Sequence, residues 1–69
     1  MPLVFVKDGE TATIKKITGN DNMRRHLSDL GFVPGELVTI VNRMNGGLIV
    51  NVKGARVALD GEMGARIIV

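Results

Sequence analysis

The side chains that could perform catalysis are few, and they lie together in the sequence. The single histidine, His26, is followed by Ser28 and Asp29, and the chain has no cysteine and no tyrosine. A nucleophile must reach its base within hydrogen-bond distance, but helix residues two apart point to different faces. His26 and Asp29 could touch, since they are three residues apart on the helix. We interpret this pair as an exposed histidine beside a carboxylate. We therefore predict a protein without catalytic residues or a cofactor.

Metal chemistry is limited by the same inventory. Ferrous sites commonly combine two imidazoles with a carboxylate, and one histidine cannot build that arrangement within one chain. The methionines Met23, Met44 and Met63 carry soft sulfur donors, but their spacing is irregular and flexible thioethers are more typical of core filling. We predict no metal site within one chain, and a weak site shared between chains stays open.

Nucleic-acid binding would need a basic groove with aromatic platforms for stacked bases. The only aromatic residues are Phe5 and Phe32, and we expect Phe5 in the core. Nine basic and seven acidic residues give a net charge of +2, with the basic residues scattered along the chain. The sequence has no glycine-rich phosphate loop. These features disfavour nucleic acids and nucleotides as ligands.

The N-terminal region predicts two strands. Residues 3–6 form an apolar run that ends at a turn containing Gly9. Residues 11–17 then alternate between apolar and polar side chains until Ile17 falls out of phase. A bulge at Lys15-Lys16 would return Ile17 to the core face.

A short helix is predicted after the second strand. Residues 19–22 break the strand and offer side-chain oxygens for an N-cap. Met23, Leu27 and Leu30 follow at i, i+4 and i+7, which places them on one stripe. Gly31 stands where a left-handed residue would end the helix. A helix of about two turns must be held by packing on the strands.

Turn signals divide the next part of the chain into a hairpin. Pro34-Gly35 predicts a type II turn, since proline suits its second position and glycine its third. Two β-branched runs follow, residues 37–42 and 48–53, and the Asn45-Gly46-Gly47 sequence between them is a strong hairpin signal. These runs should pair as antiparallel strands.

The C-terminal part completes a small barrel. A tight connection at Gly54 leads to a strand at 57–59, a helical turn or loop at 60–64, and a last strand at 66–69. Five to six antiparallel strands with close turns and one short α-helix inserted after the second strand favour a mainly β, SH3-like barrel. Closure also hides strand edges. We predict a single domain over residues 1–69.

Three segments of the chain resemble one family. They run from Gly9 to Ile14, from Arg25 to Gly35 and from Val50 to Leu59. In this order they are similar to the FeoA family, small cytoplasmic accessory proteins of bacterial ferrous iron uptake. The resemblance covers nearly the whole chain and implies an SH3-like domain. It also implies a partner, the cytoplasmic part of the membrane ferrous iron transporter FeoB, which carries a GTP-binding domain.

A docking surface is the remaining kind of site. Hydrophobic residues make up 45% of the chain, more than so small a barrel can place inside, so some must lie at the surface. Phe32 could instead pack over the helix end, and the arginines could simply be solvated. The predicted partner-binding residues are three apolar and three charged side chains: Phe32, Met44, Leu48, Arg24, Arg25 and Asp29.

Location and alternatives follow from the same features. The first residues lack a positively charged start followed by a long apolar stretch, and no window is long enough for a spanning helix. We predict a cytoplasmic, non-enzymatic regulator that the transporter recruits to the inner face of the membrane. The alternative is a free-standing metalloregulatory or nucleic-acid-associated barrel. Self-association into a homo-oligomer also stays open, since apolar surface could join two copies.

Overall fold

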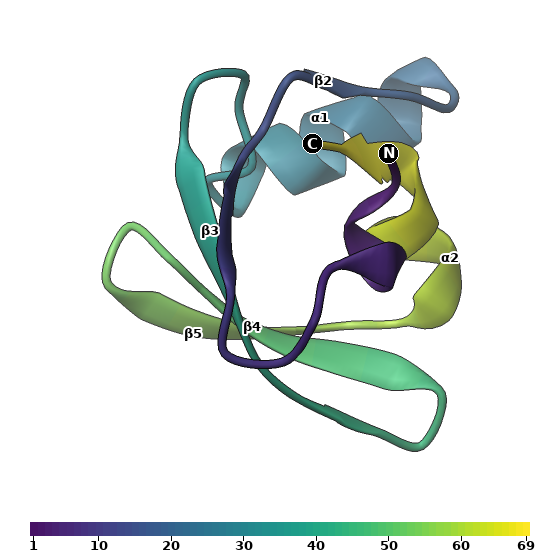
Figure 1. Ribbon diagram of the computed structural model, residues 1–69. Helices are drawn as coiled ribbons and strands as arrows, with labels where there is room; N and C mark the ends of the chain where they lie inside the picture. The colour runs from purple at the N-terminus through teal and green to yellow at the C-terminus, as the bar shows by residue number, and fades with distance from the viewer.

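Two antiparallel sheets and two helices form the protein in a computed structural model of residues 1–69 (Figure 1). The larger sheet has the strand order β1-β3-β4-β5 and the smaller pairs β2 with β6. The strands are β1 (Thr11–Thr13), β2 (Lys16–Ile17), β3 (Leu37–Met44), β4 (Gly47–Val52), β5 (Ala55–Leu59) and β6 (Ile67–Ile68). This mainly β architecture confirms the predicted fold class.

The sheets enclose one core of twelve buried apolar side chains. Alternate residues of β3 and β4 supply its centre, including Val38, Ile40, Val50 and Val52, because a strand sends every second side chain to one face. The chain ends lie side by side (Figure 1). The Val69 N–H donates to the Met1 carbonyl at 2.7 Å, which helps to close the fold.

Helix α1 (Asp21–Asp29) begins and ends as its sequence predicts. The Asn20 side chain accepts the Met23 N–H at 2.8 Å and forms the N-cap. At the other end Gly31 has a φ of +107°. The Gly31 N–H donates to Ser28 O and the Phe32 N–H to Leu27 O, both at 2.9 Å, which is a Schellman motif. The chain therefore turns back at Gly31 and sends Phe32 into the core.

The predicted turns also form. Asn45 and Gly46 have φ values of 51° and 77°, as a two-residue type I′ hairpin between β3 and β4 requires. At the Pro34-Gly35 turn, the Glu36 N–H donates to Val33 O at 3.1 Å. A positive φ is shared by five of the predicted turn glycines: Gly9, Gly31, Gly35, Gly46 and Gly54. Gly47 lies in β4, where a Cβ would come within 2.5 Å of the Leu59 carbonyl oxygen, so close packing explains it.

The prediction of an opening strand is wrong. Residues Leu3–Phe5 form a 3₁₀ turn, η1. Leu3 and Val6 are buried, whereas Phe5 between them is 69% exposed, so the prediction of a core Phe5 is wrong as well. The reason is the period of three in a 3₁₀ turn, which places Leu3 and Val6 on one face and Phe5 on another.

At Lys15-Lys16, where a bulge is predicted, the chain instead passes from the larger sheet to the smaller one. The Ile14 N–H still bonds to Glu36 beside β3, but the Lys15 N–H donates to Ile68 O at 2.7 Å, in the smaller sheet. One predicted strand therefore becomes β1 and β2. The register shift lies instead within β3, between Ile40 and Asn42.

A second helix, α2 (Gly61–Arg66), occupies the segment predicted as a helical turn or loop, so the prediction of one helix undercounts. The Asp60 side chain accepts the Met63 N–H at 2.7 Å as its N-cap. Gly64 in this helix is buried, and a Cβ there would come within 2.9 Å of side-chain atoms of Val4 and Leu48. The glycine lets α2 pack closely on η1 and β4.

Candidate docking surfaces

The side chains with catalytic potential do not bond to one another. His26, Ser28 and Asp29 are all exposed on α1, and none of them makes a side-chain hydrogen bond or ion pair. No group of three or more His, Cys, Asp or Glu side chains is placed to hold a metal ion. No helix is both long enough and apolar enough to cross a membrane.

Two of the predicted contact residues are buried. Phe32 is fully buried, so the prediction that it presents apolar surface is wrong; Leu48 is only 4% exposed, although it still lines a depression beside Met44. Phe32 follows Gly31 in the Schellman motif and is turned into the core. Leu48 pairs with Leu59 across β4 and β5, and both side chains face inward. The residues next to Phe32 and Leu48 in the sequence do not indicate whether each side chain faces the core or the solvent.

The other four predicted contact residues are exposed, but they belong to two regions. Met44 is 54% exposed at the end of β3. Arg24, Arg25 and Asp29 are exposed on α1, where Arg24 pairs with Asp21 at 3.3 Å. In Figure 1, α1 lies at the top and the turn between β3 and β4 lies at the bottom right. The charged residues of α1 therefore do not form a rim around Met44.

Three large apolar side chains that sequence reasoning did not select are also exposed. These are Met1 at 57%, Phe5 at 69% and Leu37 at 57%. Burial of Leu3 and Val6 three residues apart is the pattern that would have predicted an outward Phe5. Met1, Phe5 and Met44 are the stronger candidates for docking, because each of them lines a depression in the surface, whereas Leu37 lines neither.

The first depression, here called the hairpin depression, has a volume of about 410 Å³. It is lined by Val4 and by residues 43–48 at the turn between β3 and β4. The second, here called the terminal depression, has a volume of about 370 Å³. Its lining includes Met1, Phe5 and Val69, and the charged residues Lys7 and Glu10. Both depressions therefore combine apolar side chains with charged ones.

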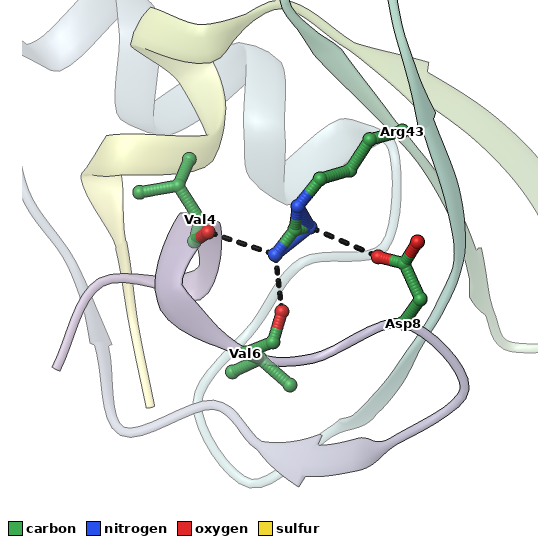
Figure 2. A network of polar contacts seen from close by, with 4 residues as sticks. All are labelled: Val4, Val6, Asp8 and Arg43. Atoms are coloured by element: carbon green, nitrogen blue, oxygen red, sulfur yellow. Dashed lines mark hydrogen bonds and ion pairs between the residues drawn. The ribbon is translucent and has the colours of Figure 1, made fainter.

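One segment separates the depressions and contributes to both. Val4 lines the hairpin depression, and Phe5 and Val6 line the terminal one. Arg43 binds this segment through its guanidinium, which donates to the Val4 carbonyl at 2.9 Å and to the Val6 carbonyl (Figure 2). The other terminal nitrogen lies 3.2 Å from Asp8 Oδ1. Sequence reasoning placed Arg43 among the scattered surface charges and missed this role.

Comparison with known proteins identifies the family. The family model described as the FeoA domain matches residues 1–69. The chain belongs to the FeoA family. It is 29% identical over 68 residues to a Methanocaldococcus jannaschii protein provisionally named Fe(2+) transport protein A, covering 99% of this chain and 83% of that protein.

Solved structures give the same result for the fold. A FeoA structure from Stenotrophomonas maltophilia, complexed with zinc and described as a prokaryotic SH3 domain protein, has a TM-score of 0.86 at 30% identity. The match covers 99% of this chain and 87% of that one. A manganese-dependent transcriptional repressor has a TM-score of 0.88 at 23% identity, covering 97% of this chain and 39% of that one. The likeness to the repressor concerns the fold alone.

Proposed function

We propose that this FeoA protein is a non-enzymatic accessory protein of ferrous iron uptake that binds the cytoplasmic part of the transporter FeoB. Its family is tied to Fe(2+) transport. The observation that carries the proposal is the pair of depressions beside the exposed side chains of Phe5 and Met44. Exposed apolar side chains at a concave surface are typical of protein-binding sites.

Regulation would follow from a difference in binding strength between two conformations of the transporter. A bound protein shifts a conformational equilibrium of its partner only by the difference between its affinities for the two states. This FeoA protein would therefore favour one conformation of the transporter from the cytoplasmic side. Arg24, Arg25 and Asp29 on α1 remain candidates for a second, separate contact.

The first test is binding to the purified cytoplasmic domain of FeoB, measured by calorimetry without nucleotide, with GDP and with a GTP analogue. Met44→Asp should weaken binding at least about tenfold, since a buried carboxylate at the contact is costly. Leu37→Asp is the matched control, because Leu37 is 57% exposed and lines neither depression. It should bind as the unmodified protein does.

The outcomes separate this proposal from its alternatives. Absence of binding in every nucleotide state would contradict the transporter as partner. Equal loss with Met44→Asp and Leu37→Asp would contradict the hairpin depression as the contact. Light scattering on the same samples tests self-association. Titration with ferrous ion tests the metalloregulatory alternative, which is suggested by the zinc complex of the Stenotrophomonas maltophilia relative.

A further inference from the structure

The segment between the two depressions has an unusual attachment to the rest of the protein. We call residues 2–8 the N-terminal strap. Leu3 and Val6 are buried in the core, but the strap has the backbone hydrogen bonds of a turn, from the Phe5 N–H to Pro2 O and from the Val6 N–H to Leu3 O. These two bonds stay within the strap. They shape it, and its one backbone link to a strand is the β-bridge between Pro2 and Ile68 of β6, at the start of the strap.

Arg43 is the only side chain that hydrogen-bonds to the strap. Its guanidinium reaches three acceptors there: the carbonyls of Val4 and Val6 and the carboxylate of Asp8 (Figure 2). Hydrogen bonds from a charged donor are stronger than neutral ones, and the planar fork of arginine can hold several acceptors at fixed angles.

The two carbonyl acceptors stand on either side of Phe5. Binding both holds the backbone before and after this residue, although the Phe5 side chain is 69% exposed and has little packing of its own. An exposed aromatic side chain whose backbone is held in this way keeps its direction at lower entropic cost than one on a free loop. The arrangement therefore orients Phe5 in the wall of the terminal depression.

We infer that Arg43 is a positioning residue that fastens the N-terminal strap to the β3–β4 hairpin and thereby orients Phe5. Because Arg43 and Val4 line the hairpin depression while Phe5 lines the terminal one, the guanidinium joins the two depressions. A change at the hairpin that withdraws Arg43 from the strap releases Phe5. This inference concerns the isolated chain and does not rest on the proposed partner.

Fluorescence can test it directly, because the chain has no tryptophan or tyrosine. Phe5→Trp places a single reporter at an exposed position, and time-resolved anisotropy records its nanosecond motion. In this background Arg43→Met should roughly double the amplitude of the fast decay. Arg56→Met is the matched control, since Arg56 is exposed on β5 and its side chain makes no hydrogen bond or ion pair. It should leave the decay unchanged.

Hydrogen exchange separates positioning from a general loss of stability. Arg43→Met should speed exchange of the Val6 amide about tenfold relative to the Ile40 amide, which bonds to Glu10 O in the larger sheet. Arg43→Lys keeps the charge but cannot present a planar fork, so it should give an intermediate ratio.

Two results would overturn the inference. One is an unchanged anisotropy decay in Arg43→Met compared with Arg56→Met. The other is an equal acceleration at Val6 and Ile40, which would give Arg43 a merely structural role. If Arg43→Met does not fold, the Arg43→Lys variant is measured instead. The inference is contradicted if the ratio of the Val6 to the Ile40 amide exchange rate in Arg43→Lys equals the ratio in the unmodified chain.

Discussion

The two phenylalanines of this protein occupy opposite environments. Phe32 is fully buried, whereas Phe5 is 69% exposed. The local backbone sets each environment. Gly31 turns Phe32 inward at the end of α1, and the 3₁₀ turn of η1 leaves Phe5 between two residues whose side chains face the core. The same side chain serves as core in one place and as surface in the other, so local geometry decides its role.

The largest expected effect is the difference between two alanine variants. Phe32→Ala should lower the free energy of unfolding by about 3–5 kcal/mol, because it leaves a cavity in the core. Phe5→Ala should change it by less than about 0.5 kcal/mol, as expected for an exposed position. Denaturant unfolding measures both, and similar losses in the two variants would remove the distinction between them.

A smaller effect is expected at the residue that turns Phe32 inward. Gly31→Ala should cost about 1–2 kcal/mol, because a residue with a Cβ is strained at a φ of +107°. A Cβ there would meet its nearest neighbour, Lys53 Cδ, at an ordinary 3.5 Å, so backbone strain is the main cost. Asparagine tolerates left-handed conformations better. Gly31→Asn should therefore lose less stability than Gly31→Ala in the same measurement, and the reverse order would argue against strain.

The elements that sequence predicts well here are those with local hydrogen-bond signals. The Asn20 cap, the Gly31 end of α1 and the Asn45-Gly46 turn each depend on residues within one turn of chain. The direction of Phe32 was missed because the residue after a Schellman glycine could have packed over the helix end or faced solvent. Only the tertiary arrangement of the core distinguishes these two outcomes.

The strap and its attachment could not be predicted for a different reason. The contact of Arg43 with Val4 and Val6 spans almost 40 residues of sequence, and nothing near Arg43 indicates it. The change of sheet at Lys15 likewise depends on Ile68, at the far end of the chain. Both features arise from closing the barrel, which brings distant segments together.

One measurement tests the central claim of this account most directly. We propose that the strap and the hairpin form the principal surface that meets the transporter, and that any contact through α1 is secondary. Isotope-labelled protein titrated with the cytoplasmic domain of FeoB, followed by NMR chemical shifts, should show the largest changes at residues 4–8 and 43–48. Changes centred on residues 21–29 of α1, or no changes with the domain in excess in any nucleotide state, would contradict it.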